Sequence, residues 1–438
     1  MKAPGNRRTH MKAKETQLQS TQDKKKTISV IGLGVVGLTT AVGFALKGHK
    51  VIGIDIDEEK VRQVNKRICP IYEPGLVRAI ENVEITATTD HGAALKSDIS
   101  FICGGTPSKP DGSIDLFYID TPARQLAEVL KAKKDRHLVV VRSTIVPGTT
   151  EGVIVPLFRD SGEVTICVNP EFLREGTAIE DFLAPDRIVI GEDGRAAGDI
   201  LCRLYDNGFK SPIYRTDIKT AEMIKYASNA FLATRVSFIN EIGNICKELG
   251  IDVYKVARGM GYDKRIGSEY LNAGIGFGGF CLPKDIAALI AKSREIGYRA
   301  RILEEASNVN KEQPLRLLKL LKKHVPSLKN KTIGILGLAF KPGTDDVRSS
   351  KAIEIIQALL DEGARVVAYD PRAMANFMRL FPGEIEFASP EKVLAAEAIL
   401  ILTEWDEFNS LDYRSKIVID GRMIAKAKEA RIYEGVCW

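Results

Sequence analysis

A glycine-rich turn near the start of the chain constrains the fold more than any other feature. The segment from Lys26 reads KTISVIGLGVVGLTTAVGFALKGHKVIGIDID, a β-like run, a Gly-x-Gly-x-x-Gly turn, a helix-like run and a second β-like run ending at Asp55. Glycines at Gly32, Gly34 and Gly37 allow a tight turn and let backbone N–H groups approach a pyrophosphate at the helix N-terminus. The pattern therefore predicts a nucleotide-binding βαβ unit.

The residue that ends the second run indicates which dinucleotide binds. A carboxylate at Asp55 can accept hydrogen bonds from ribose hydroxyls, and it would repel the 2′-phosphate of NADP. Because the Gly-x-Gly-x-x-Gly turn stands between a strand-like and a helix-like run, we favour a cofactor site over a merely structural turn. The expected cofactor is NAD.

The rest of the chain predicts an α/β protein with two Rossmann-like parallel-sheet domains joined by a long central helix and a helical middle domain. Apolar runs at Ile99–Cys103, Leu138–Arg142, Thr165–Val168 and Arg187–Ile190 alternate with helical or turn-rich segments. The segment from Asp217 to Gly250 has helical spacing and no proline, and a second strand–turn–helix–strand unit begins at Lys331 without the full glycine triplet. We expect a disordered arm at 1–26, an NAD-binding domain at 27–212, a helical dimerisation domain at 213–325 and a second Rossmann-like domain at 326–438.

Composition argues against several classes of protein. The formal charge is +6, but eight basic residues lie in the arm: Lys2, Arg7, Arg8, Lys12, Lys14, Lys24, Lys25 and Lys26. The body is therefore close to neutral, and we do not expect a nucleic-acid partner. No apolar run reaches the roughly 20 residues of a membrane span, and the arm lacks the apolar core of a secretory signal, so we expect a cytoplasmic protein without a membrane partner. Seven cysteines without CxxC spacing suggest neither a disulfide framework nor a metal site.

One cysteine stands in a setting that favours chemistry. Gly276-Phe-Gly-Gly-Phe-Cys281-Leu-Pro-Lys-Asp285 is a glycine-rich loop that delivers Cys281, with an acid four residues later. If a helix begins near Pro283, the sulfur would lie near its N-terminus, where positive potential stabilises a thiolate. A lone cysteine is more often a buried structural residue, but this loop favours a nucleophile.

Other candidates rest on position alone. Lys225 and Asn229 lie four residues apart and share a face of the predicted long helix, although such a pair is most often solvated. Ser143 and Thr144 follow one predicted strand, and Glu171 and Glu175 follow another, where open α/β sheets place ligand groups. The five histidines lie outside all these segments, which argues against a Cys/His dyad.

Seven ordered segments resemble the UDP-glucose/GDP-mannose dehydrogenase family: GLGVVG, STIVPGT, NPEFLREG, KYASNAF, DKRIGSEYLNAGIGFGGFCLPKD, FKPGTDD and LTEW. The likeness spans residues 27 to 422, and the long block is most similar to the UDP-glucose 6-dehydrogenase branch. Two residues depart from the family pattern. Phe280 stands where serine is usual, and Leu282 stands where UDP-glucose enzymes usually have phenylalanine.

The resemblance implies an NAD-dependent four-electron oxidation of the C6 hydroxyl of UDP-glucose to UDP-glucuronate. Lys225, with Asn229, Asp285 and a water near Thr144, would help remove the hydroxyl proton as hydride passes to NAD. Cys281 would attack the aldehyde, and the thiohemiacetal would be oxidised to a thioester. A water positioned by Asp285 and Glu171 would hydrolyse that thioester.

The resemblance also implies that the domain at 326–438 binds the UDP-sugar, and it implies two sets of binding residues. The cofactor set is Gly32, Gly34, Val35, Val36, Gly37, Asp55, Lys60, Thr106, Thr144, Glu175 and Arg348. The nucleotide-sugar set is Glu171, Phe172, Leu173, Arg174, Lys225, Asn229, Arg265, Tyr270, Asn272, Gly278, Lys341 and Arg422. Arg265 would reach the substrate of a neighbouring subunit, in keeping with a homodimer or higher homo-oligomer.

Two alternatives stay open at this stage. One is a dehydrogenase for GDP-mannose or for a UDP-N-acetylhexosamine, because base and sugar selectivity depend on the shape of the pocket. The other is a non-catalytic dinucleotide-binding scaffold on the same two halves. The presence of Cys281, Lys225, Asn229 and Asp285 argues against the scaffold.

Overall fold

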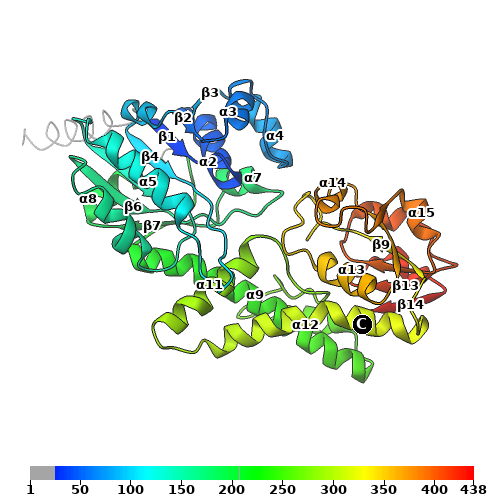
Figure 1. Ribbon diagram of the computed structural model, residues 1–438. Coiled ribbons are helices and arrows are strands. Elements are labelled where there is room, and N and C mark those ends of the chain that lie inside the picture. The colour runs from blue at the N-terminus through cyan, green and yellow to red at the C-terminus, as the bar shows by residue number, and fades with distance from the viewer. Residues whose placement is uncertain (1–24, 207) are drawn as a thin grey trace, which may run out of the picture. The chain divides into compact units, whose positions relative to one another are not determined.

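The computed structural model describes residues 25–206 and 208–438, which form two compact units. Of the described residues, the first unit comprises those up to Gly105 together with those in Leu116–Glu222, and the second comprises Thr106–Asp115 together with Met223–Trp438. The arm predicted at 1–26 falls, up to residue 24, outside the described residues. Each unit contains one sheet (Figure 1).

The first sheet has eight strands in the order β3-β2-β1-β4-β5-β6-β7-β8. They are β1 Thr27–Ile31, β2 Lys50–Ile54, β3 Ile85–Thr88, β4 Ile99–Ile102, β5 His137–Val141, β6 Val164–Val168, β7 Ile188–Glu192 and β8 Ile213–Thr216. All neighbouring strands are parallel except β6 and β7, which pair antiparallel. The strand order reverses between β1 and β4, and such a switch point is where open α/β sheets bind ligands.

Helices cover this sheet and complete its core. They are α2 Val35–Leu46, α3 Glu58–Asn65, α4 Pro74–Ile80, α5 Phe117–Leu130, α6 Val155–Leu157, α7 Ala178–Leu183 and α8 Arg195–Asp206, with short turns η1 His91–Lys96 and η2 Thr150–Ile154. Buried apolar side chains of α2, α7 and α8 form one cluster with those of β1, β4 and β5. Burial of such side chains is the main source of stability for the unit.

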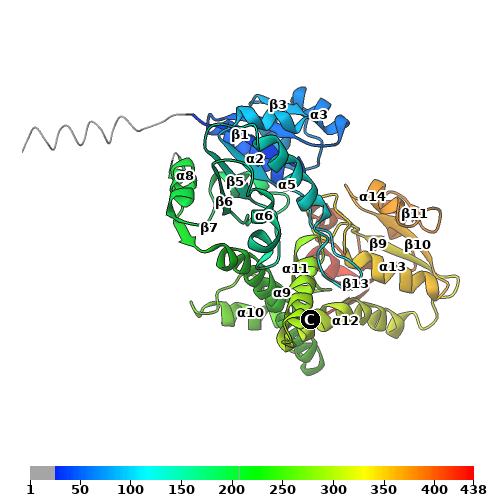
Figure 2. The ribbon, with the colours of Figure 1, turned by 60° about the vertical axis from the view of Figure 1, so that its left-hand side comes forward.

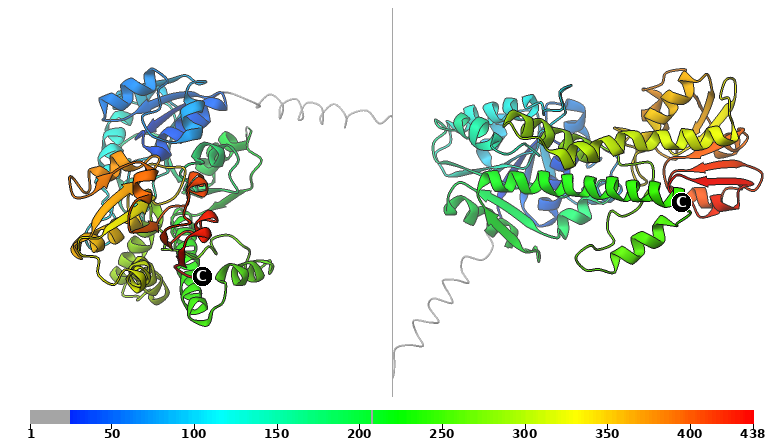
Figure 3. Two further views of the ribbon diagram at one scale, coloured as in Figure 1. Left: turned by 90° about the vertical axis from the view of Figure 1, so that its right-hand side faces the viewer. Right: turned by 90° about the horizontal axis from the view of Figure 1, so that it is seen from below.

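Four helices follow the first sheet and precede the second along the chain. They are α9 Ile218–Leu249, which starts in the first unit, α10 Val253–Gly261, α11 Cys281–Glu295 and α12 Arg301–His324. Asp217 caps α9 as predicted, because its carboxylate accepts a hydrogen bond from the backbone N–H of Thr220 at 2.9 Å. In the second unit α9 and α12 lie side by side (Figure 3), joined by hydrogen bonds from Ser237 Oγ to the carbonyl of Ala306 and between the Asn244 and Gln313 amides.

The second sheet has six parallel strands in the order β11-β10-β9-β12-β13-β14. The strands are β9 Thr332–Leu336, β10 Arg365–Tyr369, β11 Glu386–Phe387, β12 Ala398–Ile401, β13 Ile417–Asp420 and β14 Ile432–Gly435. Around them lie α13 Lys351–Asp361, α14 Met374–Met378, α15 Pro390–Leu394, η3 Asp406–Ser410 and η4 Lys426–Glu429, seen from another side in Figure 2. The predicted α/β class with two Rossmann-like sheets is confirmed.

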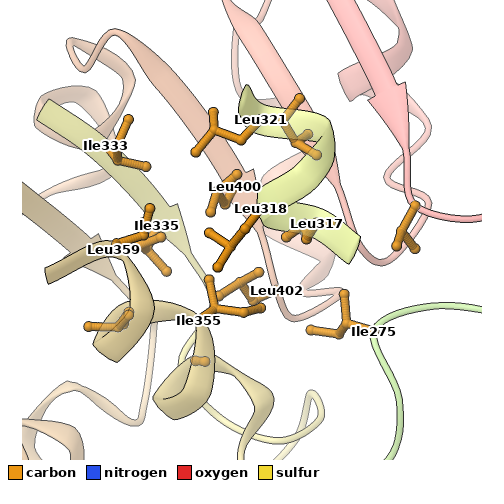
Figure 4. Close-up of a cluster of buried hydrophobic side chains, with 14 of the residues drawn as sticks. Ile275, Leu317, Leu318, Leu321, Ile333, Ile335, Ile355, Leu359, Leu400 and Leu402 are labelled. Carbon is orange, nitrogen blue, oxygen red and sulfur yellow. The ribbon is translucent and has the colours of Figure 1, made fainter. Parts of the chain in front are cut away.

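A hydrophobic cluster joins α12 to the second sheet (Figure 4). Leu317, Leu318 and Leu321 of α12 belong to the same cluster as Ile335 of β9, and Ile275, from the loop before Cys281, reaches this cluster too. The loop is thereby anchored to the core of the second unit. Among the described residues, no helix combines the length and the apolar character that crossing a membrane requires.

Candidate active site

The predicted dinucleotide turn joins β1 to α2 and has the geometry that a pyrophosphate needs. Gly32 has a φ of +88°, which favours glycine, and its N–H donates to the carbonyl of Ile54 in β2 at 2.8 Å. A Cβ on Gly37 would lie 1.7 Å from the carbonyl oxygen of Gly32, so only glycine lets α2 pack this close to the turn. A Cβ on Gly34 would meet nothing within 4 Å, which leaves space in front of the N-terminus of α2. These residues fit a bound dinucleotide phosphate.

Asp55 lies directly behind this turn, after β2. Its Oδ2 accepts a hydrogen bond from the backbone N–H of Leu33 at 2.6 Å, and its Oδ1 accepts from the N–H of Asp57 at 3.0 Å. The Lys60 ammonium lies 4.0 Å from Asp55 Oδ2. The structure thus brings Asp55 and Lys60 next to the glycine turn. Val35 and Val36 follow this turn as the first residues of α2.

The second unit repeats this arrangement in a closed form. Gly337, with a φ of +97°, donates to the carbonyl of Tyr369, as Gly32 does to that of Ile54. Here, however, Asp370 is fully buried, and its Oδ2 accepts from the N–H groups of Leu338 and Ala339 at 2.7 and 3.0 Å. The N–H of Leu33 in the first unit is bound to Asp55 in the same way, whereas Asp370 also takes up the N–H of Ala339, which corresponds to Gly34 of the first unit.

Polar residues gather where β4, β5 and β6 end in the first unit. Ser143 Oγ donates to the carbonyl of Gly104 at 2.7 Å, which ties the end of β5 to the end of β4. Half-buried Thr144 follows it, and buried Glu171 accepts from the N–H of Leu173 at 2.5 Å. Thr106, another predicted cofactor residue, is buried too, but it belongs to the second unit.

Two buried glutamates that sequence reasoning missed hold the neighbouring loops of the first unit. Glu73 accepts from the N–H groups of Gly176 and Ala178 at 2.8 and 3.0 Å, and so fixes the loop that carries Glu175. Glu222 accepts from the N–H groups of Gly148 and Thr150, in the loop that follows Thr144. Burial raises the pKa of the Glu222 carboxyl group. The partners of the two glutamates lie 72 to 105 residues away in sequence, which is why spacing gave no signal.

The segment after Glu171 is pinned by charged contacts within the first unit. Arg174 is exposed and forms an ion pair with Asp181, with Nη2 at 2.6 Å from Oδ1. Phe172 lies under the guanidinium of Arg187, whose Cζ is 3.8 Å from the ring centroid. Leu173 packs at the edge of the hydrophobic cluster of this unit.

Cys281 is the first residue of α11, as the sequence predicted for a thiol at a helix N-terminus. It is exposed, whereas Cys103, Cys167, Cys246 and Cys437 are buried. Burial raises the pKa of the Cys103 and Cys167 thiols to about 12, so they are inert at neutral pH. Among the seven cysteines, all of which are described, Cys281 therefore has the setting of a nucleophile.

Asp285 lies one turn after Cys281 on the same face of α11 and connects it to α9. Its Oδ2 accepts a hydrogen bond from Asn229 Nδ2 at 2.6 Å, and its Oδ1 forms a short buried ion pair with Lys284. Lys225 is buried one turn before Asn229 on the same face of α9. The solvated lysine that such spacing usually indicates is thus not what the structure contains.

Phe280, one of the departures from the family pattern, contacts two cations in the second unit. The Arg348 guanidinium carbon lies 4.4 Å from the ring centroid, and the Lys284 ammonium lies 5.4 Å from it. Arg348 also pairs with Asp346, with Nη2 at 2.6 Å from Oδ2. Gly278 is buried beside this segment, since a Cβ on it would lie 2.4 Å from the carbonyl oxygen of Ser349. Phe280, the residue before Cys281, therefore packs against Arg348 at the start of α11.

Lys341 and Arg422 lie near each other at the carboxyl ends of β9 and β13. Arg422 Nε donates to the carbonyl of Leu402 at 2.9 Å, and Nη2 donates at 3.4 Å to the carbonyl of Phe340, the neighbour of Lys341. Asp420 accepts from the N–H of Arg422 at 2.8 Å and fixes its backbone. Two predicted diphosphate-binding cations are thus brought to one edge of the second sheet.

Three predicted substrate residues lie between α10 and α11. The exposed guanidinium of Arg265 pairs with Asp263 at 2.6 Å, Tyr270 has a φ of +60°, and Asn272 is exposed. Within the described ranges there is no cluster of His, Cys, Asp and Glu that could hold a metal ion.

Comparisons with known proteins agree with this arrangement. Three domain families match in order: UDP-glucose/GDP-mannose dehydrogenase family, NAD binding domain, over residues 26–208; central domain, over 219–312; and UDP binding domain, over 334–427. The chain is 47% identical to the UDP-glucose 6-dehydrogenase AglM of Haloferax volcanii, over 93% of this chain and 99% of that protein. It is 37% identical to a GDP-mannose 6-dehydrogenase of Pseudomonas putida, over 94% and 100%.

A solved structure is similar over nearly the whole chain. The UDP-glucose dehydrogenase from the hyperthermophilic archaeon Pyrobaculum islandicum superposes with a TM-score of 0.93 at 42% identity, covering 95% of this chain and 99% of that one. The prediction of NAD as cofactor is confirmed by the matched NAD binding domain, and the match to the UDP binding domain supports a UDP-sugar as the substrate. The chain belongs to the UDP-glucose/GDP-mannose dehydrogenase family, whose members are NAD-dependent nucleotide-sugar dehydrogenases.

Proposed function

We propose that this enzyme oxidises the C6 hydroxyl of UDP-glucose to a carboxylate, giving UDP-glucuronate, through a thiohemiacetal and a thioester on Cys281. One observation carries the proposal. The hydrogen bond from Asn229 to Asp285 joins the buried face of α9 that holds Lys225 to α11, one turn after Cys281 begins that helix.

The residues of the first unit would hold the cofactor. Gly32, Gly34 and Gly37 would admit the pyrophosphate, and Asp55 would accept from the adenosine ribose. When bound, NAD would supply the hydride acceptor for each of the two oxidations. The family resemblance implies further cofactor contacts, which would come from Val35, Val36, Lys60, Thr144 and Glu175 of this unit and from Thr106 and Arg348 of the second unit.

The first step is removal of the C6 hydroxyl proton as hydride leaves the carbon. We assign removal of this proton to Lys225, acting with Asn229, Asp285 and a water at Thr144. The Lys225 amine is buried, so it can exchange a proton with a bound substrate, which an amine in bulk solvent would not contact. The same amine and the Asn229 amide would stabilise negative charge on the oxygen.

In the second step the Cys281 sulfur bonds to the aldehyde carbon, and the oxygen takes a proton. Loss of a second hydride together with the hydroxyl proton converts this thiohemiacetal to a thioester. Water, held by Asp285 and Glu171, then adds to the thioester carbon and breaks the C–S bond, which releases the carboxylate and restores the thiol. The aldehyde is never released into solution.

We prefer UDP-glucose over GDP-mannose as the proposed substrate because this chain is more similar to a UDP-glucose enzyme than to a GDP-mannose enzyme. The UDP-glucose 6-dehydrogenase relative is 47% identical to this chain and the GDP-mannose relative 37%. Lys341 and Arg422 would bind the diphosphate, with Phe172, Leu173, Arg174, Tyr270, Asn272 and Gly278 completing the sugar-nucleotide contacts.

The experiment is NADH production from a panel of UDP- and GDP-sugars. We expect two NADH per UDP-glucose, and we expect Cys281→Ser to lose turnover almost completely, because an ester forms and hydrolyses less readily than a thioester. One NADH per UDP-glucose with free aldehyde accumulating would contradict the scheme, and faster turnover of GDP-mannose or a UDP-N-acetylhexosamine would reassign the substrate.

We further infer a cytoplasmic homodimer built from three parts, 27–212, 213–325 and 326–438. The family domains at 26–208, 219–312 and 334–427 support the division. Phe231, Phe238 and Ile245 are exposed on α9 at seven-residue intervals, so they share one helix face that a second copy would cover. Arg265 would then serve the neighbouring subunit. The mass of the particle in solution, by light scattering, tests this: Phe238→Glu should give a monomer.

A further inference from the structure

The loop that precedes Cys281 is held by amide side chains of α9 and α12. We call residues 273–280 the nucleophile loop. Asn240 of α9 accepts the N–H of Gly274 at 2.8 Å through Oδ1, and Gln313 of α12 donates to the carbonyl of Gly274 at 2.9 Å. Both side chains are buried. The backbone of Gly274 is therefore fixed at both its donor and its acceptor.

Asn310 of α12 binds the next part of the nucleophile loop in the same way. Its Oδ1 accepts the N–H of Phe277 at 2.7 Å, and its Nδ2 donates to the carbonyl of the same residue at 3.0 Å. The two contacts define which end of the amide is oxygen, because the N–H needs an acceptor and the carbonyl a donor. Asn310 is 6% exposed, so water cannot readily replace either contact.

Two side chains of the nucleophile loop are anchored on either side of this contact. Ile275 is fully buried in the cluster that joins α12 to the second sheet (Figure 4). Phe277 is buried in another cluster with Ala233 of α9 and Ile290 of α11. Side-chain packing and the amide contacts thus fix the same four residues, 274 to 277.

Two glycines of the nucleophile loop explain why these hydrogen bonds matter for the position of the Cys281 thiol. Gly276 and Gly279 have φ values of +100° and +79°, and glycine-rich backbone has many alternative conformations unless its polar groups are held. A Cβ on Gly276 would lie 2.5 Å from Asn310 Oδ1, so the glycine is what lets Asn310 approach. Only three residues separate Phe277 from Cys281, and its backbone therefore sets where α11 begins.

We propose that Asn310 is a positioning residue that sets the placement of the Cys281 thiol through the backbone of Phe277. The inference rests on the proposed function, in which Cys281 is the nucleophile. Displacement of reacting groups by about 1 Å can lower a rate by about 10²-fold, so loss of these two hydrogen bonds should affect turnover although Asn310 does not touch the reacting atoms.

The test compares Asn310→Asp with Asn308→Asp. The first keeps the acceptor for the Phe277 N–H but turns an oxygen toward the Phe277 carbonyl. The second makes the same change at an exposed position on the same helix. We expect Asn310→Asp to lower kcat about 10-fold or more, with KM for UDP-glucose within about 3-fold, and Asn308→Asp to leave both near normal.

A second readout does not depend on turnover. The rate of iodoacetamide alkylation of Cys281, followed by peptide mass spectrometry from pH 6 to 10, should differ at least about 3-fold between Asn310→Asp and the unmodified enzyme over part of that range. Thermal melting checks that each variant is folded. If Asn310→Asp does not fold, Asn310→Ala, which removes both contacts without a buried charge, replaces it.

The outcomes separate the two proposals. A folded Asn310 variant with normal kcat and a normal alkylation profile overturns the positioning role, and so does failure of both variants to fold, since Asn310 would then act on stability alone. Full activity of Cys281→Ser overturns the proposed function instead, while the alkylation profile still decides whether Asn310 positions the thiol.

Discussion

Lys225 differs from an ordinary helix lysine because it is buried on the face of α9 that carries Asn229. If it handles the C6 proton and the negative oxygen, Lys225→Ala should lower kcat by about 10²-fold or more, the scale seen when such a group is lost. KM for UDP-glucose should change less. Steady-state kinetics of the purified variant measures both.

Lys219 supplies the matched control for this substitution. It lies two turns earlier in α9, is exposed, and pairs with Glu151 at 2.7 Å. Lys219→Ala should leave kcat nearly unchanged, since surface substitutions seldom matter. A folded Lys225→Ala enzyme with near-normal kcat would remove Lys225 from the proposed chemistry.

Asp55 makes a prediction about cofactor choice. Its carboxylate holds the N–H of Leu33 and faces the expected ribose, so Asp55→Ala should weaken NAD binding and narrow the preference for NAD over NADP. Asp55→Asn keeps an oxygen for Leu33 but removes the charge, and should narrow the preference with a smaller loss of NAD affinity. Kinetic efficiency with each cofactor checks this, and equal efficiency in the unmodified enzyme would contradict it.

Which residues could be found from the sequence depends on how far away their partners lie. Cys281 stood out because its own loop and the helix after it are contiguous, and the structure places it at the first position of α11. Asn310 and Glu73 could not be found this way, because the groups that they bind lie 33 and more than 100 residues away. Only folding brings these partners together.

Among the elements, the turn between β1 and α2 allows a paired test of fold and function. A Cβ at Gly34 has open space and an ordinary extended backbone, so Gly34→Ala should melt like the unmodified enzyme yet raise the Kd for NAD about 10-fold or more, because the methyl group takes space meant for the pyrophosphate. Gly37→Ala should instead destabilise the first unit by about 3 kcal/mol or more, since its Cβ would overlap the carbonyl of Gly32. Calorimetric titration with NAD and thermal melting distinguish the two effects, and equal losses of stability would contradict them.

Element boundaries followed from the sequence where local signals were strong. The long helix was expected between Asp217 and Gly250, and α9 runs from Ile218 to Leu249 because Asp217 caps it and no proline interrupts it. The direction of β7 was a different matter. Short apolar runs predict that a strand exists but not which way it runs, and β7 pairs antiparallel with β6.

For the whole molecule, a buried histidine predicts how stability depends on pH. His137 is 1% exposed, with Nε2 at 2.8 Å from Ser100 Oγ, and burial, assisted by nearby Lys133, lowers its pKa to about 4 from an ordinary value of 6.5. Asp98 acts in the opposite sense but more weakly. Below pH 6.5 the unfolded chain takes up a proton that the folded chain does not, so stability is lost as the pH falls from 6.5 to about 4.

The measurement is the free energy of unfolding against pH for the unmodified enzyme and for His137→Gln. The difference between the two should shift by up to about 3 kcal/mol between pH 7 and pH 4.5, with the unmodified enzyme losing more as the pH falls. Carboxylates such as Asp420 titrate in both proteins, so their contribution to the free energy of unfolding cancels in the comparison. Parallel profiles for the two proteins would contradict this prediction, because they would show that His137 takes up its proton equally in the folded and the unfolded state.

The division into compact units has a consequence for anyone who wishes to separate them. Because residues 106–115 group with the second unit, the chain passes from one unit to the other three times, at 105/106, 115/116 and 222/223. A gene cut after Glu222 would encode a fragment that still carries a short piece of the other unit, without Ala287 beside its Gly112. A split-protein reporter divided there would begin with two mismatched halves, whereas a circular permutant opened in an exposed loop would keep all three crossings.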